Sequence, residues 1–214
     1  MPTSAPRPQL RVVCIRHGQT AWNAERRILG RTDLPLDATG LAQADALASA
    51  WPSGWQIGAM VSSPLARARG TAAPLAAAAK VDLVLDEGLV EMDQGTLEGL
   101  PAELLARDHA ALLAAWRDDP GAVTLPGGEA MLEVQRRGLA TLRRLAAEHA
   151  EAGTLVIVTH QLLLSAVLCG LADEPLRRWR AWSHRNTAWC QIAWGDPPQV
   201  VEHDVAPHLG HATH

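Results

Sequence analysis

Residues 10–20 read Leu-Arg-Val-Val-Cys-Ile-Arg-His-Gly-Gln-Thr and join a short apolar run to a polar turn. The run over residues 10–15 is rich in β-branched side chains, which is typical of a buried parallel strand. His17 follows in the turn, directly after Arg16. In sheets of parallel strands, ligands bind outside the carboxyl ends of the strands. The stretch therefore predicts a strand that delivers Arg16 and His17 to a binding crevice.

Two later segments repeat this pattern of a strand with polar residues at its exit. Residues 59–63 form the next expected strand, and a helix capped by Ser63 is expected to carry Arg67 in its first turn. Residues 154–159 form the strongest strand of the sequence, and His160 follows it. Because all three strands end in polar residues, we expect three separate segments to converge on one crevice.

The remaining segments alternate between helices and strands. Helices are expected at 37–51, 102–116 and from 129 to about 150, and further strands at 81–85, 188–194 and 200–205. The last two strands are separated by a Gly- and Pro-rich hairpin signal. This alternation predicts an α/β fold with a mostly parallel, mixed sheet that is covered on both faces.

The length and composition fit one domain. The chain has 214 residues, of which 48% are apolar, and this suits a single globular core. We expect the domain to span residues 10–206, with a small helical insert at about 100–120. Residues 1–9 are predicted to be a flexible leader, and residues 207–214 a flexible tail that contains histidines.

Charge excludes several classes of partner. The formal net charge is −4, which gives no basic field for nucleic acid or an anionic membrane. The chain has a single lysine, Lys80, so arginines are the expected source of an anion site.

Localisation is inferred from three weak signals. The N-terminal residues lack the apolar core of a signal peptide, and the apolar stretch 162–172 is far shorter than the roughly 20 residues of a membrane span. Cys14, Cys169 and Cys190 are odd in number and show no metal or redox spacing. These features favour a reducing cytoplasm, with the cysteines as packing residues.

Two histidines and two arginines at strand exits suit a tetrahedral oxyanion. Guanidinium groups match phosphate oxygens in pairs, and neighbouring cations should lower the pKa of His17 and keep its imidazole nucleophilic. A covalent phosphohistidine would divide hydrolysis into two easier steps. The loop 91–95 contains carboxyl groups, and one of them could give a proton to the leaving alcohol, because a bound phosphate would raise its pKa. A Gly-x-x-x-x-Gly-Lys nucleotide loop is absent, and Cys14 lies inside a strand, so other phosphoryl-transfer chemistries are not favoured.

Several blocks in a fixed order resemble the histidine phosphatase, or phosphoglycerate mutase-like, superfamily. The blocks are residues 16–23, 30–36, 63–71, 89–99, 126–129 and 158–160. The resemblance implies a three-layer α/β/α sandwich without a metal or other cofactor. It also implies a role for each residue of the site: His17 as the phosphorylated nucleophile, Arg16, Arg67 and His160 as phosphoryl ligands, Asn23 and Gly30 as further contacts, and Glu91 as the proton donor. Family members usually have Gly after the second histidine, where this chain has Gln161, so Gln161 could narrow the pocket or bind a substrate oxygen.

The resemblance leaves the reaction and the substrate open. Mutases of this family carry a longer insert with Tyr and Lys, whereas this chain has no Tyr and its one Lys lies outside the insert. Hydrolysis of a small phosphate monoester is therefore favoured, with phosphoryl transfer by a mutase or binding without turnover as alternatives. The substrates implied are sugar phosphates, phosphoglycerate esters and α-ribazole phosphate. A homodimer is left open.

Overall fold

A six-stranded sheet is the middle layer of the structure, a computed structural model that describes residues 9–210. The strands are β1 (Leu10–Arg16), β2 (Ala59–Ser62), β3 (Leu83–Leu85), β4 (Thr154–Thr159), β5 (Trp189–Trp194) and β6 (Gln199–Val205). Their order is β3-β2-β4-β1-β5-β6. The pairs β1–β4, β2–β4 and β2–β3 are parallel, and β1–β5 and β5–β6 are antiparallel. The expected mostly parallel, mixed sheet is confirmed.

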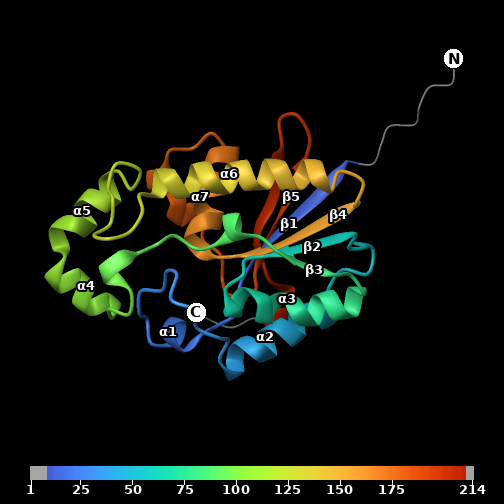
Figure 1. Ribbon diagram of the computed structural model, residues 1–214, viewed down its shortest axis with the longest axis horizontal. Coiled ribbons are helices and arrows are strands. Elements are labelled where there is room, and N and C mark those ends of the chain that lie inside the picture. Colours follow the sequence, from blue (N-terminus) through green and yellow to red (C-terminus); the bar gives the residue numbers. More distant parts are fainter. Residues whose placement is uncertain (1–8, 211–214) are drawn as a thin grey trace, which may run out of the picture.

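Helices cover both faces of this sheet (Figure 1). The helices are α1 (Ala21–Ala24), α2 (Ala38–Ser49), α3 (Ala66–Ala79), α4 (Ala102–Asp108), α5 (Ala110–Asp118), α6 (Met131–Glu148) and α7 (Gln161–Leu171). Helices α6 and α7 pack on one face and α2 and α3 on the other. Successive residues of a strand point to opposite faces, so Val12 and Cys14 lie in the core with α6 and α7, while Val13 and Ile15 lie in the core with α2 and α3. The α/β/α sandwich is confirmed.

The three strands with polar exits are neighbours in the sheet. Strands β2, β4 and β1 are adjacent and parallel, so their carboxyl ends meet at one edge. The first residues after these strands are Ser63, His160 and His17. The sheet thereby brings together segments that are more than 90 residues apart along the chain.

The insert consists of two helices instead of the one that the sequence predicted. Helix α4 ends at Asp108 and α5 begins at Ala110. His109 lies between them with φ −124° and ψ 33°, outside the helical range, so the chain changes direction there. Figure 1 shows both helices beyond one end of the sheet.

The start of α3 differs from the expectation. Ser63 does not cap this helix, which begins at Ala66. The Ser63 hydroxyl lies 2.7 Å from Nε2 of His160 and accepts the backbone N–H of Leu65 at 3.4 Å, ahead of the first turn of α3. Instead, Oδ1 of Asp33, in the loop after β1, accepts the backbone N–H of Ala66 at 2.6 Å.

Part of the predicted flexible tail is ordered. Pro207–Leu209 form a 3₁₀ turn, His208 stacks on Trp189 with ring centroids 5.8 Å apart, and its Nε2 is 2.8 Å from the Thr187 hydroxyl. Aromatic stacking on the sheet explains this order, which local composition does not encode. Residues 211–214 and 1–8, where the rest of the tail and nearly all of the leader fall, lie outside the described residues.

Candidate active site

His17 is buried at the end of β1 with one ring nitrogen committed to the backbone. Its side chain is 3% exposed, and its Nδ1 lies 2.7 Å from the carbonyl oxygen of Gly18. A carbonyl only accepts hydrogen bonds, so Nδ1 carries the proton and Nε2 carries the lone pair. The His17 carbonyl in turn accepts the Asn186 amide at 2.9 Å, which fixes the turn. The geometry therefore leaves Nε2 as the nucleophilic atom.

Burial and two arginines keep His17 neutral. Burial has the largest effect and, with the charges of Arg67 and Arg16, lowers the pKa of His17 well below its usual 6.5. The sequence pointed to the cations alone, and the structure adds burial as the larger cause. A neutral imidazole is the form that can attack phosphorus.

Arg67 is fully buried and is aimed by carbonyl groups of the loop after β1. Its Nη1 donates to the Thr32 carbonyl at 2.9 Å and its Nη2 to the Gly30 carbonyl at 2.6 Å. Arg16 is held similarly, with Nη1 donating to the His184 carbonyl at 2.5 Å. Burial lowers the pKa of Arg16 to about 10, which still leaves it charged at neutral pH.

His160 occupies the N-cap position of α7, without a capping hydrogen bond from its side chain, and lies beside His17. The two ring centroids are 5.2 Å apart, and Nε2 of His160 lies 2.7 Å from the Ser63 hydroxyl. Burial, followed by the charge of Arg67, lowers the pKa of His160 well below its usual value. This ring is therefore also neutral near pH 7, so it offers a hydrogen bond and not a positive charge.

Three nitrogens of this cluster are buried without a hydrogen-bond partner among residues 9–210. They are Nε of Arg16, Nε of Arg67 and Nδ1 of His160. Buried polar atoms are rarely left unpaired, because an unpaired group costs about 1–3 kcal/mol. Two of the three belong to guanidinium groups, so the cluster suits an anion with several acceptor oxygens. The structure thus brings together four residues that the sequence singled out for phosphoryl binding.

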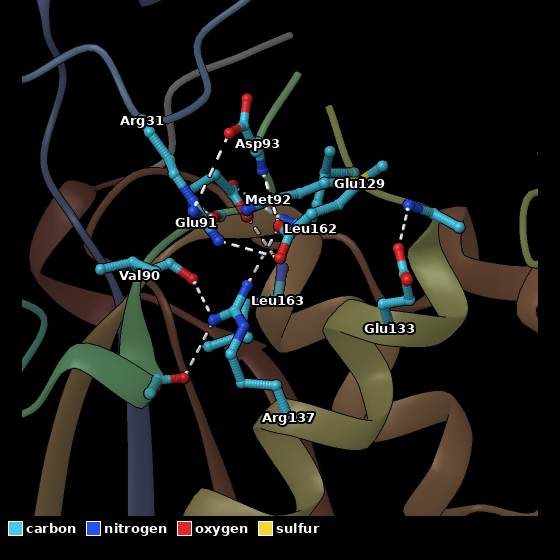
Figure 2. Close-up of polar contacts among 12 residues, drawn as sticks. Arg31, Val90, Glu91, Met92, Asp93, Glu129, Glu133, Arg137, Leu162 and Leu163 are labelled. Carbon is cyan, nitrogen blue, oxygen red and sulfur yellow. Dashed lines mark hydrogen bonds and ion pairs between the residues drawn. The ribbon is translucent and has the colours of Figure 1, made fainter. Parts of the chain in front are cut away.

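Of the carboxyl groups in the loop after β3, Glu91 is the one whose pKa is raised, as a proton donor requires. It is 3% exposed, and its carboxylate accepts the backbone N–H groups of Met92 at 2.8 Å and of Leu162 and Leu163 at 3.0 Å each (Figure 2). Burial raises the pKa of Glu91, while these N–H groups and Arg67 oppose the rise without cancelling it. A carboxyl with a raised pKa can begin a reaction cycle protonated.

A network of charges holds the loop of Glu91, as Figure 2 shows. Nη1 of Arg137 on α6 donates to the carbonyl groups of Gly88 and Val90 at 3.0 and 2.8 Å. Its Nη2 lies 3.3 Å from Oε2 of Glu129, and Glu129 also pairs with Arg31 at 2.9 Å. Sequence reasoning did not find Arg137, whose only signal was an arginine on an amphipathic helix.

The remaining predicted contacts have different positions. Asn23 completes a capping box with Thr20, the N-cap of α1, by accepting the Thr20 backbone N–H at 3.1 Å. Asn23 also lines a cavity beside Glu91. Gly30 has no positive φ. A Cβ at Gly30 would lie 2.0 Å from the Glu98 carboxylate, so close approach explains the glycine. Gln161 binds within the protein, with Nε2 donating to Ser165 at 2.8 Å and Oε1 accepting the His184 N–H at 3.0 Å.

Neither alternative carboxyl group replaces Glu91. Glu98 accepts hydrogen bonds from Arg31, Thr32 and Gln94, and these lower its pKa against the opposing effect of burial. Asp93 accepts the Gly95 N–H at 2.9 Å and is partly exposed. Both side chains therefore hold backbone groups of their loops.

A cavity of about 280 Å³ opens beside Glu91, bordered by Asn23, Gln161 and the insert. Across residues 9–210, no group of three or more His, Cys, Asp or Glu side chains is placed to hold a metal ion. In the same part of the chain, the helices are too short or too polar to cross a membrane.

Comparison with known proteins identifies the class that this fold and site define. The model of the histidine phosphatase superfamily (branch 1) matches residues 12–204, so the chain belongs to this superfamily. The chain is 31% identical over 207 residues to the protein named probable phosphoglycerate mutase GpmB of Proteus mirabilis (strain HI4320), covering 96% of this chain and 94% of that one.

Solved structures show the same architecture. A native mycobacterial glucosyl-3-phosphoglycerate phosphatase is 28% identical with a TM-score of 0.81, covering 91% of this chain and 98% of that one. The α-ribazole phosphatase from Shigella flexneri shares the fold, with 24% identity, a TM-score of 0.80 and coverage of 92% and 96%. The family membership predicted from the sequence blocks is confirmed.

Proposed function

We propose that this chain is a phosphatase that hydrolyses small-molecule phosphate monoesters through a phosphohistidine on His17, with Glu91 as the proton donor. The observation that carries the proposal is the orientation of the His17 ring, whose Nδ1 is bound by the Gly18 carbonyl. A neutral ring fixed in this tautomer presents Nε2 as a nucleophile beside two arginines. Family membership places the chain among phosphatases and mutases.

In the first step, Nε2 of His17 forms a bond to phosphorus while the bond from phosphorus to the ester oxygen breaks. The departing oxygen takes the proton of the Glu91 carboxyl. Arg16, Arg67 and His160 bind the phosphoryl oxygens, where charge develops. In the second step, water gives a proton to Glu91 and attacks phosphorus, the P–N bond breaks, and inorganic phosphate leaves. His17 and Glu91 return to their starting protonation states.

Hydrolysis fits this chain better than phosphoryl return to a second substrate. The single lysine, Lys80, ends α3 and does not line the cavity beside Glu91. The chain has no tyrosine. A mutase must keep its phosphoglycerate bound until the phosphoryl group is transferred back. By the family resemblance, Tyr and Lys side chains of a longer insert bind the phosphoglycerate in mutases. The matched relative named as a mutase keeps transfer as the second candidate.

Release of p-nitrophenol from p-nitrophenyl phosphate tests the proposal, with His17→Ala as the variant. We expect a loss of about 10⁴-fold or more in kcat, because the nucleophile is removed. Mass spectrometry without acid should trap a phosphoryl group on His17 of the wild type. Equal turnover by His17→Ala, or label on another residue, would show that the assigned roles are wrong. Conversion of 3-phosphoglycerate to its isomer faster than phosphate release would favour the mutase.

A further inference from the structure

We propose that the leaving group of the natural substrate is predominantly apolar, and that the insert helices α4 and α5 select it. This inference rests on the proposed function, because it concerns the part of the ester that departs with the proton of Glu91. It narrows the substrate class to monoesters of alcohols with an aromatic or branched aliphatic body, and it disfavours sugars and sugar acids.

The position of Glu91 shows which part of the substrate enters the cavity. Glu91 lines the cavity of about 280 Å³, whereas His17, Arg16, Arg67 and His160 do not. A proton donor must touch the departing oxygen. The phosphoryl group therefore lies among the histidines and arginines, and the organic body of the ester extends past Glu91 into the cavity.

Apolar side chains dominate the wall of this cavity. Six of them come from the insert, from α7 and from the 3₁₀ segment Leu176–Trp182: Leu105, Leu112, Leu113, Trp116, Leu162 and Trp179. The indole nitrogen of Trp179 is buried without a hydrogen-bond partner among residues 9–210, so the wall keeps one donor for an acceptor atom of the ligand. Cavities that hold drug-sized ligands measure about 300–1,000 Å³. The space beside Glu91 therefore suits a body of one or two rings.

The two glutamine side chains on the wall already have partners inside the protein. Both ends of the Gln161 amide are bound, to Ser165 and to the His184 N–H. The Gln94 amide donates to the Leu29 carbonyl at 3.0 Å.

The two charged side chains of the wall besides Glu91 lie toward solvent. Arg27 is exposed and is bound to Glu25 and to the Gly99 carbonyl. Arg180 is also exposed and lies over the Trp179 ring, 4.5 Å from its centroid.

A sugar hydroxyl placed in this cavity would lose water and find few partners. Burying a hydroxyl without a hydrogen bond is unfavourable, whereas burying a ring or an alkyl chain is favourable. Trp116 of the insert is 7% exposed and is part of this wall.

The test compares esters of primary alcohols, so that the leaving groups are similar in intrinsic reactivity. We expect kcat/KM for 2-phenylethyl phosphate to exceed that for glycerol 3-phosphate and glucose 6-phosphate by at least about ten-fold, as hydrophobic pockets discriminate by small apolar groups. Leu112→Asn, on the cavity wall, should reduce this ratio several-fold. Leu104→Asn is the matched control, because Leu104 is 38% exposed on α4 and lies outside the cavity.

Calorimetric binding of phosphonates separates failure of this inference from failure of the proposed function. 3-Phenylpropyl phosphonate corresponds to 2-phenylethyl phosphate, and 3,4-dihydroxybutyl phosphonate corresponds to glycerol 3-phosphate. Each has a CH₂ group in place of the ester oxygen and cannot be hydrolysed. Tighter binding of the phenyl compound supports the inference even if the chain turns over no ester. Equal or tighter binding of the dihydroxy compound, or a preference for glycerol 3-phosphate in turnover, would overturn it while leaving the phosphatase reading intact. If Leu112→Asn does not fold, Leu113→Asn on the same wall takes its place.

Discussion

The two halves of the site are formed by different kinds of side chain. The phosphoryl half consists of charged and polar side chains at the ends of β1 and β4 and in the first turn of α3, with His17, Arg67 and His160 at 0–3% exposure. The leaving-group half consists of apolar side chains from the insert and from residues 176–182. Residues on a packed sheet are held rigidly, whereas an insert can change without disturbing the core. Under the proposed function, the contrast assigns the chemistry to residues at the sheet edge and the specificity to the insert.

Glu91 lies where the two halves meet, and its replacement should have the largest effect. For an alkyl ester, Glu91→Gln should lower kcat/KM by about 10²–10⁴-fold, since an alkoxide leaves poorly without a proton. For p-nitrophenyl phosphate the loss in kcat/KM should be much smaller, because p-nitrophenolate is stable without one. The comparison uses kcat/KM because kcat also contains the second step, in which Glu91 takes a proton from water whichever ester is used. Steady-state kinetics on both esters measure the difference. An equal loss on both would mean that Glu91 only caps α7 and is not the acid.

The pH dependence of activity tests the assigned roles of His17 and Glu91, because the pKa values of both groups are shifted. Activity needs neutral His17 and protonated Glu91. The pKa of His17 is lowered well below 6.5, so activity should persist as the pH falls below 6.5 and decline only through the lower value. The pKa of Glu91 is raised above its usual value, so kcat/KM should fall about ten-fold per unit as the pH rises past it.

The alkaline decline has its own control. Glu91→Gln removes the group that ionises, so its profile should lose this limb while the ionisation of the substrate stays the same. An alkaline limb that is unchanged in the variant would assign it to another group.

Arg137 tests whether the position of the Glu91 loop depends on a side chain of α6. Arg137→Met keeps an unbranched apolar stem but removes the bonds to the Gly88 and Val90 carbonyls and to Glu129. We expect kcat for an alkyl ester to fall about ten-fold with KM nearly constant, because the loop of Glu91 loses its position. Unfolding in urea should show a loss of about 1–3 kcal/mol.

The matched variant is Arg143→Met on the same helix. Arg143 is exposed, so its replacement should change stability by less than about 0.5 kcal/mol. If Arg137→Met lowered stability and lowered kcat/KM by the same factor for the alkyl and the p-nitrophenyl ester, its role would be structural only. It would then not position Glu91.

The same division decides what the sequence could predict. Short β-branched runs followed by polar residues located β1, β2 and β4, and neighbouring parallel strands then had to bring His17, Arg67 and His160 together. Ser63 was assigned to the wrong helix start because its hydroxyl is used 97 residues away, by His160. Local patterns carry no record of such a contact.

The insert was harder to predict for a physical reason. A short helix of mixed charge is usually solvated, and nothing local shows that Trp116 turns inward. The ordered position of His208 depends likewise on stacking over Trp189. Prediction succeeded where strand alternation determines the outcome, and it failed where one side chain docks against a distant surface.

The smallest expected effect concerns Gln161, the residue directly after His160. Its amide joins the start of α7 to the segment before β5, through Ser165 and the His184 N–H, and the His184 carbonyl in turn binds Arg16. A double-mutant cycle of Gln161→Ala and Ser165→Ala in urea unfolding should give a coupling of about 1 kcal/mol, since one hydrogen bond links the pair. The cycle removes the effect of Ser165 on the Trp182 carbonyl, which is common to both backgrounds. A coupling near zero would show that the Gln161 amide is not held by Ser165. The amide would then be free to bind a hydroxyl of the substrate. The leaving-group half would in that case be less apolar than its contrast with the phosphoryl half requires.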